Sequence, residues 1–288
     1  MRNTSGTLLN LDQQGLQHLE LDWAALESVQ VLRARENELT TLPADLWQLQ
    51  QLQVLSVGEN DLSEIPPMIG RFTNLHELYV DGNPLRTLPD AIGQLIHLHT
   101  LDIGHCRLES LPASLANLRS LAFFYASDNQ LHECPAWIDS LTNVQYFNMT
   151  DNQLQVLPDA IGDLHNLIEL RLYNNQLQNL PRTIGNLERL RELHLRGNRI
   201  VELPDTIGDL AQLRILDLRN NALSELPETV ANLSHLLYLD LRGNELQSVP
   251  QAIGALPRLE KLDLRWNRID QKTAWMEQLE ARGCLVYI

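Results

Sequence analysis

The sequence contains little cysteine and no apolar run long enough to cross a membrane. Its three cysteines in 288 residues are too few, and odd in number, for a disulfide framework, which indicates a reducing compartment. A membrane-spanning helix needs about 18 or more consecutive apolar residues. The N-terminal segment MRNTSGTLLNLDQQGLQ also lacks the apolar stretch and the small-residue cleavage site of a secretory signal. We therefore expect a cytoplasmic protein, or one exported without a cleavable signal into a host cell.

Aromatic residues and lysine are scarce as well. Aromatics make up 5% of the chain, and only two of its 22 basic residues are lysine, a usage that we attribute to a GC-rich genome. The formal net charge is -15. A surface of this sign disfavours nucleic acids and anionic membranes, and we expect neither as a partner.

What the sequence has in abundance is a repeat of 23 residues. Its fixed point is an asparagine, once replaced by cysteine, in eleven evenly spaced units: Asn37, Asn60, Asn83, Cys106, Asn129, Asn152, Asn175, Asn198, Asn221, Asn244 and Asn267. A proline follows six residues later in ten consecutive units, within the motif L-x-x-L-x-L-x-x-N-x-L-x-x-L-P-x-x-I-G-x-L. Self-similarity at this period, with this motif, predicts a leucine-rich repeat solenoid.

Each part of the repeat has an expected structural role. In Leu193-His194-Leu195 the alternation of apolar and polar residues predicts a half-buried strand with its leucines inward. The amide of Asn198 is expected to satisfy backbone groups at the turn that follows, and Pro204 prevents a strand or helix from continuing. We predict an α/β fold, a right-handed horseshoe-shaped solenoid with a parallel β-sheet on its concave face and short helical or irregular segments on its convex face.

The period also predicts the domain organisation. Residues 1–28 keep apolar residues at core positions without the full motif, which indicates an N-terminal capping repeat. Residues 29–269 hold the eleven repeats. Residues 270–288 form a C-terminal cap, in which DQKTAWMEQLEARG is a helix closed by Gly283 and CLVYI a final strand. We expect one continuous monomeric domain, with a weak dimer through the C-terminal edge as the alternative.

The stretch LPDAIGDLHNLIELRLYNNQL closely resembles the 23-residue repeats of the Ras-suppressor and Shoc2-like proteins, their plant relatives and many bacterial leucine-rich repeat proteins. The resemblance covers residues 29–269. It implies recognition of a protein partner on the concave face without catalysis, and we expect a bacterial source.

No arrangement of residues indicates catalysis or a metal centre. Cys106 is expected to point inward while His105 points outward, which forbids a Cys-His pair, and Cys134 is expected to be a small buried hydrophobe. His97 and His99 are placed to face one side together, but no third ligand is spaced to join them. Phosphate-binding glycine loops and nucleophile elbows are missing. We expect no enzyme activity, no cofactor and no bound metal.

Two columns of charge follow the outward strand positions. We call the asparagine that recurs in every repeat, once replaced by cysteine, the ladder residue. The positions two residues before it hold Arg196, Arg219, Arg242 and Arg265. The positions four residues before it hold Arg171, His194, Asp217, Asp240 and Asp263. Because neighbouring strands lie about 4.8 Å apart, each column stacks charges that the other column offsets. One interpretation is a self-neutralising grid that stabilises the sheet. The other is a surface whose arginines bind carboxylates or phosphates of a partner.

Tyrosines gather on the same outward positions. Five of the six are there, namely Tyr79, Tyr125, Tyr146, Tyr173 and Tyr238, and Phe123 and Trp266 join them. The preference of tyrosine for strands explains part of this distribution. Rigid aromatic rings among polar groups are also typical of a binding hot spot. The central rings, those of Phe123, Tyr125, Tyr146 and Tyr173, are flanked by Asp102, Asn148 and Arg171.

We therefore predict a non-enzymatic interaction module that binds a protein or peptide on its concave face. The residues expected to contact the partner are Tyr79, Asp102, Phe123, Tyr125, Tyr146, Asn148, Arg171, Tyr173, His194, Arg196, Arg219, Tyr238, Arg242, Arg265 and Trp266. The alternative is a bacterial effector whose repeats select a host target for an activity supplied elsewhere.

Overall fold

Each repeat folds as a three-residue strand, a turn around the ladder asparagine and a short 3₁₀ helix. In the repeat of Asn198 these elements are β10 (Glu192–His194) and η9 (Asp205–Asp209). The structure is a computed structural model that describes residues 3–288. These residues form two units, which we call unit 1 (through Leu131) and unit 2 (His132–Ile288).

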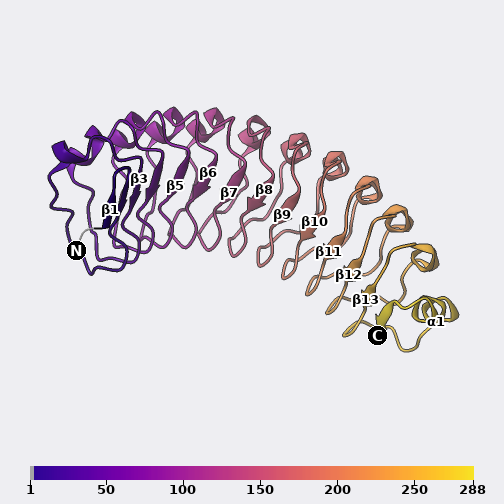
Figure 1. Cartoon of the computed structure of the whole chain (residues 1–288). Coiled ribbons are helices and arrows are strands. Elements are labelled where there is room, and N and C mark those ends of the chain that lie inside the picture. Colours follow the sequence, from indigo (N-terminus) through magenta and orange to yellow (C-terminus); the bar gives the residue numbers. More distant parts are fainter. Residues whose placement is uncertain (1–2) are drawn as a thin grey trace. The chain divides into compact units, whose positions relative to one another are not determined.

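Unit 1 has its strands side by side, with the 3₁₀ helices along the opposite side (Figure 1). The strands are β1 (Asn3–Ser5), β2 (Leu8–Asn10), β3 (Val31–Arg33), β4 (Val54–Ser56), β5 (Glu77–Tyr79), β6 (Thr100–Asp102) and β7 (Phe123–Tyr125). The 3₁₀ helices are η1 (Trp23–Leu26), η2 (Ala44–Gln48), η3 (Pro67–Arg71), η4 (Asp90–Gln94) and η5 (Ala113–Asn117). β1 and β2 pair antiparallel, and the pairs from β2 to β7 are parallel.

Unit 2 repeats the same arrangement. Its strands are β8 (Tyr146–Asn148), β9 (Glu169–Arg171), β10, β11 (Ile215–Asp217), β12 (Tyr238–Asp240), β13 (Lys261–Asp263) and β14 (Leu285–Tyr287). Its helices are η6 (Ala136–Ser140), η7 (Asp159–Asp163), η8 (Arg182–Asn186), η9, η10 (Glu228–Asn232), η11 (Gln251–Ala255) and α1 (Ala274–Ala281). Each strand from β8 to β13 pairs parallel with the next, so that the series ends at β14. The predicted parallel sheet with short helical segments opposite it is confirmed in both units.

The core of each unit lies between the strands and the 3₁₀ helices. Leu193 and Leu195 are fully buried beneath β10, and Ile207 of η9 is buried opposite them. Pro204 has the extended backbone expected before such a helix, with φ -67° and ψ 148°. A Cβ atom at Gly208 would lie 2.3 Å from the carbonyl oxygen of Thr229 in the next repeat, so the glycine is required because the 3₁₀ helices stack so closely.

The ladder asparagines satisfy the backbone of the turns, as the sequence predicts. Asn198 donates from Nδ2 to the carbonyl oxygens of Leu172 (3.0 Å) and Leu195 (2.9 Å), and its Oδ1 accepts from the amide of Leu177 (3.0 Å). The side chain thus joins two successive repeats. At Cys106 the Sγ atom lies 3.3 Å from the carbonyl oxygen of Gly104, and it offers a far weaker version of these bonds.

A helix and a strand are present near the C-terminus as expected, but the helix is shorter than the predicted stretch of residues 270–283 and begins only at Ala274. Helix α1 is followed by Gly283, whose φ of 95° is in the left-handed region that glycine adopts easily. The chain then enters β14, where Leu285 pairs with Lys261 of β13. None of the helices within residues 3–288 combines the length and the apolar character that crossing a membrane requires.

Candidate functional site

The outward side chains of each repeat lie six, four and two residues before the ladder position, and we call them the strand face. The first two belong to the strand, which ends four residues before the ladder residue, as at His194 in β10. The residue directly before the ladder position is left-handed in every repeat, with φ 62° at Trp266 for example. The prediction that Tyr173, Trp266 and the arginine column lie within strands is therefore wrong. They follow the strands, because the chain must already turn towards the asparagine.

Tyr79, Asp102 and Tyr125 form one row across unit 1. Tyr79 of β5 is paired with Asp102 of β6, and Asp102 with Tyr125 of β7. The Tyr79 hydroxyl donates to Oε2 of Glu77 at 2.9 Å. Phe123 lies beside the row, with its ring 5.2 Å from that of His99. The register thus brings a carboxyl group between two tyrosines.

This environment raises the pKa of two groups of the row, Asp102 and Tyr79. Burial raises the pKa of Asp102 to about 6, and the negative charge of Asp81 acts in the same direction. The amide of Gly104 donates to Oδ1 of Asp102 at 3.0 Å and opposes the shift only in part. Burial, followed by the hydrogen bond to Glu77, raises the pKa of Tyr79 to about 12. Both side chains are partly buried although they belong to the outward surface, and partial burial of this kind shifts the pKa of a polar group.

In unit 2 two tyrosine rings are covered by arginines of the following repeat. The guanidinium of Arg171 lies 5.5 Å from the ring centroid of Tyr146, and that of Arg196 lies 5.1 Å from the ring centroid of Tyr173. Asn148 is buried beside Tyr146, and its Oδ1 accepts from the amide of Thr150 at 3.0 Å. These stacks hold the long arginine side chains in place.

The predicted central patch divides between the two units. Phe123 and Tyr125 belong to unit 1, and Tyr146 and Tyr173 belong to unit 2. Within each unit the aromatic residues have polar neighbours on the strand face. A single patch that combines all four rings stays a prediction.

Three arginines of the charge columns of unit 2 form ion pairs with the aspartate two residues before them in the same repeat. Arg219 pairs with Asp217 at 2.6 Å, and two pairs of the same kind follow at 2.7 Å: Arg242 with Asp240, and Arg265 with Asp263. Burial acts to raise the pKa of Asp263, but the hydrogen bond from Arg265 and the charge of Arg242 outweigh it and hold that pKa below its ordinary value. These geometries fit the interpretation as a self-neutralising grid.

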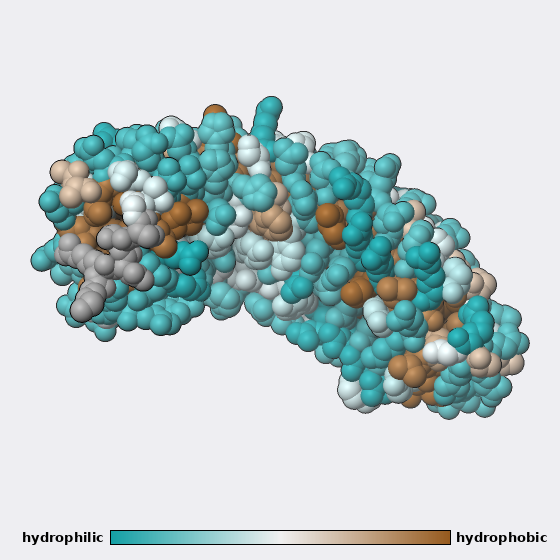
Figure 2. Space-filling model, viewed as in Figure 1, coloured by the Kyte–Doolittle hydropathy of each residue, from teal (hydrophilic) through white to brown (hydrophobic). Residues whose placement is uncertain are grey.

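Two other aromatic residues are exposed, namely Tyr238 on the strand face and Trp266 directly before the ladder position. Trp266 has 72% of its surface accessible, and the guanidinium of Arg265 lies 5.8 Å from its ring centroid. Tyr238 is exposed and donates from its hydroxyl to Oε2 of Glu260 at 2.9 Å. Figure 2 shows a largely hydrophilic surface with hydrophobic side chains at both ends of the view and in patches between them. Leu285, near the C-terminus, is exposed. Dimerisation through this edge stays a prediction.

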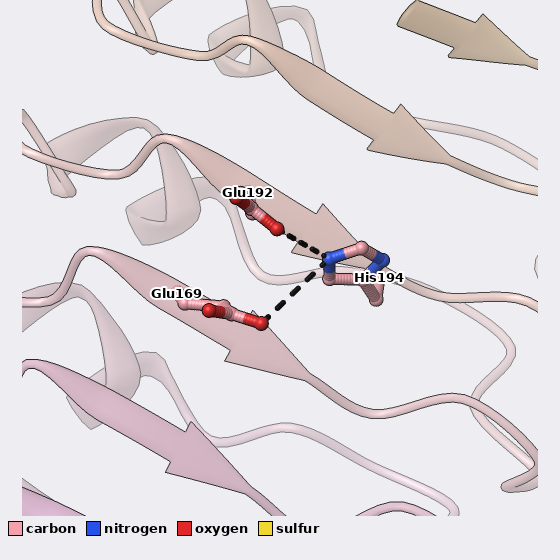
Figure 3. A group of neighbouring side chains, drawn as sticks. All are labelled: Glu169, Glu192 and His194. Atoms are coloured by element: carbon pink, nitrogen blue, oxygen red, sulfur yellow. Dashed lines mark hydrogen bonds and ion pairs between the residues drawn. The ribbon is translucent and has the colours of Figure 1, made fainter.

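One group of potential metal ligands escaped the sequence interpretation. Among the described residues, Glu169, Glu192 and His194 have ligand atoms within 4.8 Å of one another (Figure 3). Only His194 was expected at a site. The available signal was the pair of glutamates six residues before the ladder position in successive repeats, with a histidine two residues after the second.

The other reactive side chains lie as the sequence predicts. Cys106 and Cys134 are buried, and burial raises their pKa values to about 11 and about 12. His105 points outward and contacts Asp128. The two histidines considered as a pair have different neighbours, because the ring of His97 stacks on His76 while that of His99 packs on Phe123.

Three leucine-rich repeat family models match the chain. A model described as Leucine-rich repeat region matches residues 182–282, one described as Leucine rich repeat matches residues 73–131, and a third, Leucine Rich Repeat, matches residues 166–187. A search of curated proteins found no match.

Solved structures of repeat proteins resemble the chain over most of its length. A leucine-rich repeat protein of Leptospira interrogans is 29% identical with a TM-score of 0.53, over 98% of this chain and 95% of that one. The plant peptide hormone receptor RGFR1, solved in complex with RGF2, is 28% identical with a TM-score of 0.75, over 91% of this chain and 47% of the receptor chain. The chain thus spans about half of that receptor. An internalin of Listeria monocytogenes is 23% identical with a TM-score of 0.76, over 98% of this chain and 86% of the internalin chain. At this identity the likeness shows the fold alone.

Proposed function

Since this chain is a leucine-rich repeat protein, we propose that it is a non-enzymatic interaction module that binds a protein or peptide partner on its strand face. The observation that carries the proposal is the placement of the tyrosines there: five of the six lie on the strand face, and none is among the buried side chains of the core. Tyr146 and Tyr173, each covered by an arginine, present rigid rings next to cationic groups. Such combinations of tyrosine and arginine dominate the binding energy of many interfaces.

The two units offer different chemistry to a partner. In unit 1 the carboxyl group of Asp102 lies between Tyr79 and Tyr125, an environment suited to a hydrogen-bond donor or a cationic side chain. In unit 2 the arginines that follow β10 to β13 are neutralised by aspartates or stacked on tyrosines. They are suited to setting the register of a partner through polar contacts at the rim.

The similarity to a plant peptide hormone receptor in complex with RGF2 supports peptide or protein binding as the class of activity. The effector alternative has no observation of its own in its favour. The internalin likeness concerns the fold alone, and a cytoplasmic location and a bacterial source stay predictions.

Photo-crosslinking tests the proposed face directly. A photoreactive amino acid is introduced in place of Tyr125 or Tyr173, and in matched chains in place of the exposed Val156 or Val201, which lie outside the strand face. The intact chain is used to capture a partner from a lysate of its source, and the adducts are identified by mass spectrometry. Adducts concentrated at the two tyrosine positions are expected. Adducts concentrated at the valine positions would contradict the proposed face.

A further inference from the structure

We propose that Glu169, Glu192 and His194 form a binding site for a divalent transition-metal ion of the zinc class on the strand face of unit 2. Nε2 of His194 lies 3.1 Å from Oε2 of Glu192 and 3.9 Å from Oε1 of Glu169. In Figure 3 both carboxylates point towards the same ring nitrogen. The site is independent of any partner protein.

The register of the sheet fixes this convergence. Glu169 of β9 is paired directly with Glu192 of β10, and His194 follows Glu192 by two residues on the same face of the strand. Strand positions of this kind hold ligands more rigidly than loop positions. All three ligands therefore come from two hydrogen-bonded strands of unit 2, with buried leucines between them.

The separations suit a small ion with three protein ligands. Zinc bonds to histidine nitrogen and carboxylate oxygen are about 2.0–2.2 Å long, so tetrahedral ligand atoms lie about 3.4 Å apart. The measured 3.1 Å and 3.9 Å lie on either side of that value, and small side-chain rotations would close the site. The side chains are 18–35% exposed, which leaves the fourth position open to water.

Arg171, which is not itself a metal ligand, is hydrogen-bonded to one of the three proposed ligands, Glu169. Its Nε donates to Oε1 of Glu169, and its guanidinium lies over the ring of Tyr146. Carboxylate ligands are commonly oriented by such outer hydrogen bonds. Oε1 of Glu169 has a second lone pair, so it is able to bind an ion while it accepts the hydrogen bond from Arg171.

The local charge pattern changes at this point of the sheet. In the following repeats an aspartate is paired with the arginine two residues later in its own repeat, as Asp217 is with Arg219. In β10 the partner of Glu192 is His194 instead. Imidazole nitrogen together with carboxylate oxygen selects zinc, cobalt, nickel or copper over calcium and magnesium, which prefer oxygen ligands alone.

Titration of the tag-free full-length chain tests the site. Co²⁺ is added and followed by its visible absorption spectrum, and Zn²⁺ is added in a calorimeter. One saturable site is expected that excess Mg²⁺ and Ca²⁺ do not block. His194→Ala and the milder Glu192→Gln are each expected to weaken binding at least about tenfold.

Matched controls distinguish this site from adventitious binding. His165→Ala and Glu188→Gln remove the same residue types from exposed positions of unit 2 outside the strand face, and they are expected to leave the affinity unchanged. Circular dichroism verifies that each variant is folded. The proposal is overturned if the chain shows no saturable binding of either ion, or if Glu192→Gln binds as tightly as the parent.

Discussion

The guanidinium of Arg35 binds the carboxylate of Asp81 across the glycine at position 58. Nη1 and Nη2 of Arg35 lie 2.9 Å and 2.7 Å from the two oxygens of Asp81, although the residues are two repeats apart. Gly58 occupies the equivalent position of the repeat between them, and its missing side chain is what lets the pair meet. The charge on Asp81, only 4% exposed, is thus neutralised by a bidentate partner.

Gly58→Ala is expected to lower the free energy of unfolding by about 1–3 kcal/mol, because separating the pair leaves a buried carboxylate unpaired. A Cβ atom at this position would lie 2.5 Å from both Nη1 of Arg35 and Oδ1 of Asp81. Urea denaturation measures the effect. In an Arg35→Ala background the penalty of Gly58→Ala should shrink, since the pair is already broken. An equal penalty in both backgrounds would show that the glycine serves another purpose.

Asn175→Ala is expected to destabilise the chain by about 1–3 kcal/mol, because it leaves buried backbone groups without partners. Asn175 donates to the carbonyl oxygens of Met149 (2.9 Å) and Leu172 (3.0 Å), and it accepts from the amide of Leu154 (2.9 Å). The midpoint of chemical denaturation measures the loss. An unchanged midpoint would mean that these groups are satisfied in another way.

Cys106 is the cysteine at a ladder position, and replacing it with asparagine should change stability in the opposite direction to Asn175→Ala. Cys106→Asn is expected to stabilise the chain by about 0.5–1.5 kcal/mol, because an amide restores stronger hydrogen bonds than the thiol makes. The Sγ atom now lies 3.3 Å and 3.7 Å from two carbonyl oxygens. A loss of stability in thermal unfolding would show that the repeats at this position have adapted to cysteine.

Asp102 should make the stability of the chain depend on pH. Burial raises its pKa from 3.8 to about 6, so between these values the folded chain holds more protons than the unfolded chain. Stability therefore falls as the pH rises through this window. Relative to Asp102→Asn, the parent chain should lose on the order of 1–2 kcal/mol between pH 4 and pH 7.

Urea denaturation across this range measures the difference. Asp61→Asn, at an exposed position of unit 1, corrects for the removal of one negative charge. A parent chain that gains stability over Asp102→Asn as the pH rises would contradict the environment described for this carboxyl group.

The three cysteines should be inert in the folded chain. Cys106, Cys134 and Cys284 are all buried, and burial raises the pKa of each thiol. Since the thiolate is the reactive form, iodoacetamide at pH 7.5 should modify them far more slowly than in denaturant. Mass spectrometry counts the adducts. Rapid modification of the native chain at any of the three would indicate an accessible, activated thiol and reopen the question of chemistry.

The 23-residue period made the architecture predictable, because residues 23 positions apart occupy equivalent places in successive repeats and so form a column along the solenoid. The burial of Leu193 and the hydrogen bonds of Asn198 both follow from the position of each residue in the repeat. The period does not say how far a long side chain reaches along a column. The contact of Arg35 with Asp81 depends on such reach, and the sequence interpretation therefore missed it.

Local backbone geometry was harder to predict than position. The residue before each ladder position has a left-handed φ. Glycine and asparagine, as at Gly197 and Asn220, adopt this region readily, whereas tryptophan, as at Trp266, does not, so residue type does not indicate the conformation there. The convergence of Glu169 on His194 depends on side-chain rotamers that no column assignment contains. The Tyr79, Asp102 and Tyr125 row, by contrast, follows from strand register alone.

The most direct test of the account is the affinity of a captured partner for paired variants of unit 2. Tyr146→Ala with Tyr173→Ala removes both arginine-covered rings from the strand face. Val156→Ala with Val201→Ala removes two exposed apolar side chains outside it. Calorimetry should show the tyrosine variant at least about 2 kcal/mol weaker, with the valine variant and the unfolding midpoint of both close to the parent. Parent-like affinity in the tyrosine variant, together with weakened binding in the valine variant, would contradict the assignment of the strand face as the binding surface.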